Sequence, residues 1–116
     1  MGHQAESYLL KIEKEKIRIE AQDEAGLFYA FITLSQIIDD AQGQTLPMLE
    51  INDAPKIAFR PIQIDIKHHL EKKTYYYDLM DHLAQLKING VILEIEDKLQ
   101  YELSLIHISE PTRLGF

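Results

Sequence analysis

The chain has 116 residues, of which 46% are hydrophobic and 27% are charged, and this composition is typical of a globular protein rather than a disordered or fibrous one. The formal net charge of −7 disfavours binding to nucleic acid or to an anionic membrane surface, because both are polyanions. The absence of cysteine excludes disulfides, thiolate metal sites and a cysteine nucleophile. The chain carries no recognisable signal peptide or bilayer-long apolar stretch, so we expect a soluble chain whose localisation is unknown.

Residues 7–12 and 16–21 show partial apolar alternation and are joined by three charged residues, a pattern that predicts a β-hairpin. Asp23 can cap a helix that continues to Asp40. Helical spacing on one wide apolar face is shared by Leu27, Ala30, Phe31, Leu34, Ile37 and Ile38. Residues 46–51 predict an edge strand or an extended crossing that ends before Pro55, and residues 53–56 predict a domain boundary.

The second half of the chain reads as strand, helix, strand. Residues 57–66 contain a strand with alternate isoleucines on one face, and residues 91–95 form a nearly continuous apolar strand. Thr74 can cap the helix between them, and Asn89-Gly90 is a suitable left-handed ending. The predicted buried stripe of this helix comprises Tyr76, Leu79, Met80, Leu83 and Leu86. Such a unit leaves two parallel strands with open edges, as at the start of an α/β barrel or a doubly wound sheet.

Four motifs in this order resemble glycoside hydrolase family 20, the β-N-acetylhexosaminidases. The helix sequence of residues 26–37 is similar to that of the family's small α/β domain, and residues 51–60 are similar to its link into the catalytic barrel. Asp65 and His69 match the end of the first barrel strand, and residues 87–89 match the segment before the second. Two departures, Pro61 in place of a glycine and the second strand itself, indicate a divergent branch.

The resemblance implies an α/β fold class: part of a small α/β domain, a β-hairpin plus helix, followed by the first β-α-β of an incomplete (β/α)8 TIM barrel. The expected domains are residues 1–55 for the non-catalytic domain and residues 56–102 for the start of the barrel. Residues 103–116 resemble a translated sequencing adapter and are expected to be an artefactual tail, so the gene would be cut off near Glu102. The alternative is a genuine apolar strand over residues 103–108 that Pro111 ends.

The resemblance also implies a reaction. Family members remove terminal β-linked N-acetylhexosamine from glycans by substrate-assisted, retaining hydrolysis, in which the 2-acetamido oxygen attacks and a glutamic acid protonates the leaving group. The family's catalytic Asp-Glu pair follows the fourth barrel strand and has no counterpart here, so we expect no catalytic residue and an inactive fragment. The expected partner is a glycan substrate, no cofactor is implied, and family members are often secreted or periplasmic. The alternative is a small carbohydrate-binding or protein-interaction module without catalytic activity.

Two substrate-binding residues are implied, Arg60 and Asp97. Arg60 falls on a family arginine that binds sugar hydroxyls, and a guanidinium offers several donors in a fixed fork. The alternative for Arg60 is an ion pair with a carboxylate at the domain junction. Asp97 aligns with the first aspartate of the family's terminal pair near the barrel mouth, and its alternative is surface charge at a strand end.

Other polar clusters favour ordinary explanations. Glu94 and Glu96 lie at i and i+2 on one strand and cannot face each other across a sugar, so we expect surface charge, although Glu96 could also line the pocket. His68 and His69 point to opposite faces without a third ligand nearby, so no metal site is expected. The three tyrosines of residues 75–77 predict one core residue, Tyr76, and two partly exposed ones rather than a sugar-stacking platform.

Overall fold

The structure is a computed structural model that describes residues 4–66 and 72–94. The chain divides into two compact units, Met1–Ala58 and Phe59–Phe116, and each is described by itself. The division falls a few residues after the boundary that the sequence predicts. The tail of residues 103–116 lies outside the described residues, so the prediction of an artefactual tail stays a prediction.

The first unit contains a three-stranded antiparallel sheet. Strands β1 (Tyr8–Ile12) and β2 (Ile17–Ala21) form the predicted hairpin, whose turn is closed by a hydrogen bond from Glu13 N to Lys16 O at 2.8 Å. Strand β3 (Leu49–Asp53) returns to pair with the other side of β1, so the strand order is β2-β1-β3. The predicted edge strand is therefore present, beginning and ending slightly later than expected.

Helix α1 (Glu24–Ala41) packs against the sheet through β1 and β2. The predicted cap is confirmed, because the Asp23 carboxylate accepts a hydrogen bond from Gly26 N at 2.7 Å. The helix starts very close to the sheet: a Cβ atom added to Gly26 would lie 2.2 Å from the carbonyl oxygen of Ser7. Only glycine allows this approach without a shift of the backbone.

The core of the first unit lies between α1 and the sheet. Tyr8 joins three elements here, since its hydroxyl contacts Thr33 Oγ1 at 2.6 Å and donates to Asp53 Oδ2 at 3.1 Å. The predicted single apolar face of α1 is wrong in part, because Leu27, Phe31 and Ile38 are 42%, 53% and 47% exposed. These three side chains recur on the face of the helix that the sheet does not cover. The buried core cluster consists of Tyr8, Leu10, Tyr29, Ala30 and Ile32.

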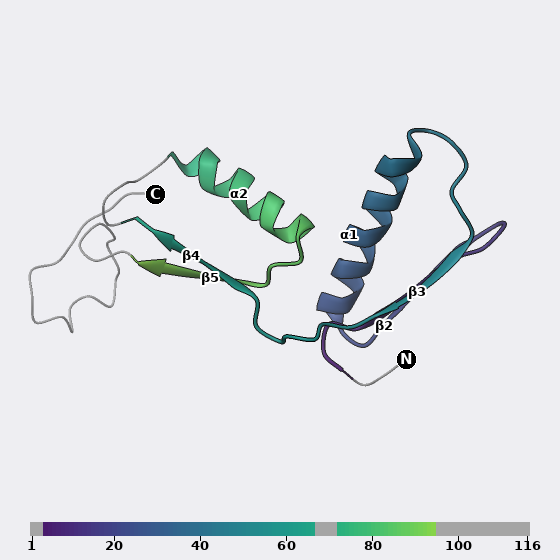
Figure 1. Cartoon of the computed structure of the whole chain (residues 1–116), viewed down its shortest axis with the longest axis horizontal. Helices are drawn as coiled ribbons and strands as arrows, with labels where there is room; N and C mark the ends of the chain where they lie inside the picture. The colour runs from purple at the N-terminus through teal and green to yellow at the C-terminus, as the bar shows by residue number, and fades with distance from the viewer. Residues whose placement is uncertain (1–3, 67–71, 95–116) are drawn as a thin grey trace, which may run out of the picture. The chain divides into compact units, whose positions relative to one another are not determined.

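The second unit is the predicted strand, helix and strand. Strands β4 (Pro61–Asp65) and β5 (Gly90–Glu94) pair in parallel, and α2 (Lys73–Gln85) connects them (Figure 1). Ile66 and Leu83 are the buried apolar residues in the described part of this unit. Two strands and one helix do not make a barrel, so the (β/α)8 continuation stays a prediction.

Three details of α2 differ from the sequence-based expectation. The cap residue is Lys72 rather than Thr74, which lies inside the helix. The left-handed residue after the helix is Lys87, with φ of 59°, whereas Gly90 is the first residue of β5. The predicted buried stripe is wrong at two of its five positions, because Met80 is 38% and Leu86 71% exposed over a sheet of only two strands. No helix among the described residues is long and apolar enough to cross a membrane.

Candidate functional site

The carboxyl ends of β4 and β5 bring three polar side chains together. Asp65 and Glu94 are register partners in the parallel pair, and Ile66 N donates to Glu94 O at 3.0 Å. Gln63 Nε2 donates to Glu94 Oε1 at 3.0 Å, and Gln63 shares a strand face with Asp65 because the two are two residues apart. Parallel α/β folds place their binding sites at the carboxyl ends of strands. This end of the pair is therefore the candidate site.

These polar groups lie on the sheet face opposite α2. Leu93 faces the helix, where it lines a mainly apolar hollow of about 260 Å³ with Tyr76 and Tyr77. Glu94 follows Leu93, and successive strand residues point to opposite faces. Tyr75 and Tyr77 are 50% and 65% exposed, as predicted, whereas Tyr76 is half-buried rather than a core residue.

Arg60 lies at the other end of the strand pair. It directly precedes β4, and its Nε donates to the carbonyl oxygen of Lys87 at 2.8 Å. Its backbone N–H donates to Asn89 Oδ1 at 2.7 Å, and Asn89 N donates back to Arg60 O at 3.1 Å. These bonds hold Arg60 at the amino ends of the strands, and its sugar-binding role stays a prediction.

Several predicted residues lie outside the described part of the chain: Asp97, Glu96, His68 and His69. Within residues 4–66 and 72–94, no group of three or more His, Cys, Asp or Glu side chains could hold a metal ion. Neither Gln63 nor the contacts of Asn89 were predicted from the sequence. Gln63 could have been found from its two-residue spacing to Asp65, whereas the contact between Asn89 and Arg60 depends on the parallel register.

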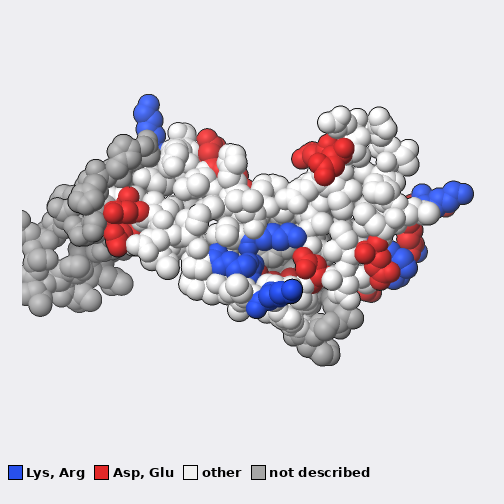
Figure 2. All heavy atoms as spheres, viewed as in Figure 1, with Lys and Arg blue, Asp and Glu red and all other residues white. Residues whose placement is uncertain are grey.

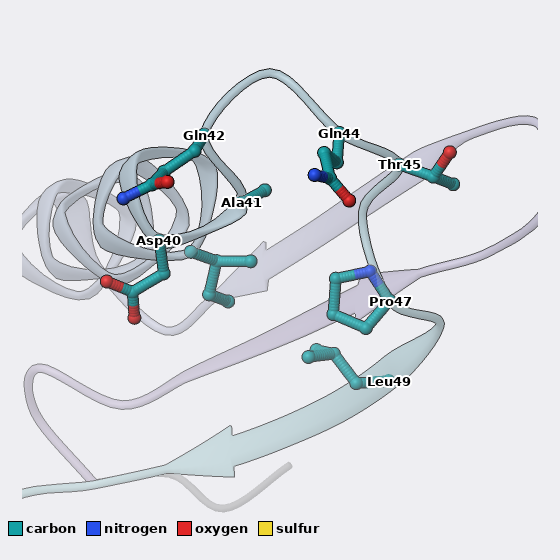
Figure 3. Close-up of a pocket in the computed structure, with 8 residues that line it drawn as sticks. Asp40, Ala41, Gln42, Gln44, Thr45, Pro47 and Leu49 are labelled. Atoms are coloured by element: carbon teal, nitrogen blue, oxygen red, sulfur yellow. The ribbon is translucent and has the colours of Figure 1, made fainter.

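A second hollow, of about 480 Å³, lies at the end of α1 in the first unit (Figure 3). Ile37, Pro47 and Leu49 supply its apolar part, and Asp40, Gln42, Gln44 and Thr45 surround them. Asp40 is the single ionisable side chain among the residues that line it.

Charged side chains of the described residues form small separate groups on the face shown in Figure 2 rather than one extended patch. One group lies in the hairpin turn, where Glu13 contacts Lys11 Nζ at 3.4 Å and Lys16 Nζ at 3.6 Å. Desolvation alone would raise the pKa of Glu13, but its hydrogen bond with Lys11 and the charges of Lys16 and Lys11 hold that pKa below its ordinary value. This ion pair is exposed and structural.

Comparisons with known proteins agree with the fold. A profile described as "Glycosyl hydrolase family 20, domain 2" matches residues 2–54. The chain is 29% identical over 109 residues to the N,N'-diacetylchitobiase of Vibrio harveyi. The aligned region covers 94% of this chain and 12% of that protein. It is 31% identical over 94 residues to the β-N-acetylhexosaminidase of Cellulomonas fimi, and the aligned region covers 79% of this chain and 19% of that protein.

Solved structures give the same result. A structure described as a glycoside hydrolase family 20 β-N-acetylglucosaminidase has a TM-score of 0.75 at 31% identity, covering 88% of this chain and 22% of that one. A β-N-acetylhexosaminidase from Bacteroides fragilis NCTC 9343 has a TM-score of 0.75 at 26% identity, and the match covers 96% of this chain and 25% of that chain.

The two units thus have the fold of part of a glycoside hydrolase. The chain belongs to glycoside hydrolase family 20. It spans 12% and 19% of the length of the two curated relatives named above.

Proposed function

We propose that a longer protein containing this chain removes terminal β-linked N-acetylhexosamine from glycans. The observation that carries this proposal is the agreement between the family 20 profile over residues 2–54 and two relatives that cover most of the chain, one named as an N,N'-diacetylchitobiase and one as a β-N-acetylhexosaminidase. The substrate's 2-acetamido oxygen attacks the anomeric carbon while a glutamic acid protonates the leaving oxygen, and water then completes hydrolysis with retained configuration.

In this proposal the chain contributes part of the substrate pocket but does not contribute the catalytic acid. The family's Asp-Glu pair has no counterpart in the sequence. The carboxyl ends of β4 and β5, with Gln63, Asp65 and Glu94, supply polar groups to the pocket, and Asp97 binds a sugar hydroxyl. Carboxylates suit this role because they accept hydrogen bonds from hydroxyl donors.

Hydrolysis of 4-nitrophenyl N-acetyl-β-glucosaminide tests both parts of the proposal. We expect the longer protein to release 4-nitrophenol and to give the β-anomer of the sugar first, as seen by proton NMR. The 116-residue chain at equal concentration should release none above the uncatalysed rate. An inactive longer protein with an intact Asp-Glu pair contradicts the proposed reaction, and an active 116-residue chain contradicts the absence of a catalytic acid.

Asp97→Asn in the longer protein tests the proposed sugar contact. We expect a rise in KM of roughly tenfold or more, corresponding to a lost charge-assisted hydrogen bond, with the protein still folded. Asp81→Asn, at an exposed position of α2, is the matched control. An unchanged KM in Asp97→Asn contradicts the contact.

A second candidate function, a non-catalytic interaction module, is favoured by one observation: the exposed apolar side chains of Leu27, Phe31 and Ile38 on α1. Sedimentation and thermal melting of the 116-residue chain separate the two candidates. A monomeric chain with one cooperative melt supports a self-contained module. If instead the chain self-associates and Phe31→Ser reduces this self-association, the result supports a chain that needs the rest of a larger enzyme.

A further inference from the structure

The register of the parallel pair β4–β5 has to be set without a tight turn. The two strands are connected through α2 and its loops rather than by a hairpin, so loop geometry does not fix how they align. A slip of two residues would keep every side chain on its face but would move the carboxyl ends apart by about 6.6 Å. Asp65 and Glu94 would then no longer lie opposite each other.

Hydrogen bonds at the amino ends of the strands prevent such a slip. Pro61 begins β4 and has no N–H to donate, so the nearest donor is the backbone N–H of Arg60. Asn89 uses its side-chain oxygen to accept from this N–H at 2.7 Å and its own N–H to donate to Arg60 O at 3.1 Å. A two-residue shift of β5 would carry Asn89 away from Arg60 and break both of these bonds.

The guanidinium of Arg60 adds a third hydrogen bond, whose acceptor belongs to a residue with a left-handed backbone conformation. Arg60 Nε donates to the carbonyl oxygen of Lys87 at 2.8 Å. Lys87 adopts a left-handed conformation with φ of 59°, which is unfavourable for a residue other than glycine. A strained residue persists where surrounding bonds over-determine it, and here Lys87 N also donates to Ala84 O at 2.9 Å.

We propose that Arg60, Lys87 and Asn89 form a register clamp, in which Arg60 is a positioning residue rather than a sugar ligand. The clamp aligns β4 with β5, and this alignment brings Asp65 opposite Glu94 and Gln63 within 3.0 Å of Glu94 at the far end. The importance of the clamp for glycan binding rests on the proposed function, whereas the effect of the clamp on strand register is independent of that function. Binding sites at the carboxyl ends of parallel strands leave the amino ends to stability.

Disulfide trapping measures the register directly, because the chain has no cysteine of its own. The in-register pair is Asp65→Cys with Glu94→Cys, whose Cα atoms would be about 4.8 Å apart as neighbours in a sheet. The slipped pair is Asp65→Cys with Ile92→Cys, which reacts only if β5 moves by two residues. We expect the in-register pair to oxidise and the slipped pair to stay reduced.

Substitutions in the clamp should change this ratio. Asn89→Ala should lower the in-register to slipped ratio roughly tenfold, the effect of losing one partly buried hydrogen bond, and Asn89→Asp should restore it because it retains the oxygen. Lys87→Val should act like Asn89→Ala, whereas Lys87→Gly should not, since glycine accepts a positive φ. Asn52→Ala, at an exposed position of β3, is the matched control. An unchanged ratio in Asn89→Ala and Lys87→Val overturns the proposal.

A second measurement leaves all three clamp residues unchanged. The sequence contains three arginines, so ¹⁵N-arginine labelling gives three Nε–H signals; Arg18→Lys and Arg113→Lys assign two of them and leave that of Arg60. The clamp predicts that the Arg60 Nε–H exchanges with water at least roughly tenfold more slowly than that of Arg18, an exposed residue of β2. Equal exchange rates overturn the clamp.

The longer protein then separates a clamp from a sugar contact. A clamp predicts that Arg60→Ala, Asn89→Ala and Lys87→Val change KM and kcat together and alike, and that Asn89→Asp rescues both. A direct sugar contact predicts that Arg60→Ala alone raises KM, which would overturn the assignment of Arg60. An inactive unsubstituted protein would contradict the proposed function and leave the disulfide result as the decision on the clamp.

Discussion

The two units solve the same packing problem to different extents. The first unit places a helix on a three-stranded antiparallel sheet and buries a cluster of five residues. The second unit places a helix of similar kind on two parallel strands, and Ile66 and Leu83 are its buried apolar residues in the described part. Parallel strands normally require cover on both faces, whereas an antiparallel sheet can expose one. The first unit therefore has the more complete core.

Leu10→Ala should have the largest effect on this difference. Leu10 is fully buried in the central strand, and its truncation leaves a cavity that should lower the free energy of unfolding of the first unit by about 3–5 kcal/mol. Chemical denaturation followed by amide hydrogen exchange of each unit measures it. Met48→Ala, at a 70% exposed position of the same unit, is the control. A loss below about 1 kcal/mol would show that the core does not carry the stability of this unit.

Gly26→Ala should come next. The new Cβ atom would lie 2.2 Å from a backbone oxygen, that of Ser7, so the start of α1 must move away from the sheet. We expect a loss of about 3 kcal/mol, at the upper end for overpacking, because backbone cannot rotate aside as a side chain can. Ala25→Ser, at the exposed neighbouring position, should change the stability by about 0.5 kcal/mol at most. Similar losses in both variants would contradict the close approach.

Leu83→Ala tests the smaller core of the second unit. Leu83 is 5% exposed and lies over a sheet of two strands, so its neighbours can collapse into part of the space. The loss should be about 2 kcal/mol, less than that of Leu10→Ala. Leu86→Ala, at a 71% exposed position just after α2, is the matched control. Equal losses for Leu83→Ala and Leu10→Ala would remove the distinction between the two units.

The smallest expected effect depends on pH and concerns the hairpin turn of the first unit. The pKa of Glu13 is lowered in the folded chain, so its stabilising contribution is present above the unfolded pKa of about 4.5 and is lost as pH falls through the folded pKa. The stability difference between the unsubstituted chain and Glu13→Gln should therefore shrink on acidification. Glu15→Gln in the same turn is the control. A difference that grows at low pH would reverse the sign of the shift.

Much of the fold was predictable because its signals are local. The hairpin, the Asp23 cap and the strand-helix-strand order follow from alternation and helical spacing in short stretches of sequence. The faces of the helices were harder to predict, since α1 is apolar on both sides. Gly26, Tyr29 and Ala30 are buried against the sheet, where the small residues Gly26 and Ala30 allow close approach, and the exposed Phe31 is just as apolar.

The candidate site was predictable in part for a related reason. Asp65 ends a strand with clear alternation, so its place could be read from the sequence. The contacts of Arg60 could not, because they depend on a register between segments almost thirty residues apart and on a left-handed Lys87 that no glycine marks. The sequence predicted the left-handed position at Asn89-Gly90, where Asn89 instead provides the side-chain acceptor.

The strand order β2-β1-β3 also has a consequence for how the chain is made. As the ribosome extends the protein from its amino end, β1 can pair with β2 and receive α1 as soon as these have emerged, but its other edge waits for β3, which begins at Leu49. The nascent chain therefore carries an uncovered strand edge while some thirty further residues are translated. How long that edge stays uncovered during synthesis is set by the topology and not by the final stability of the sheet.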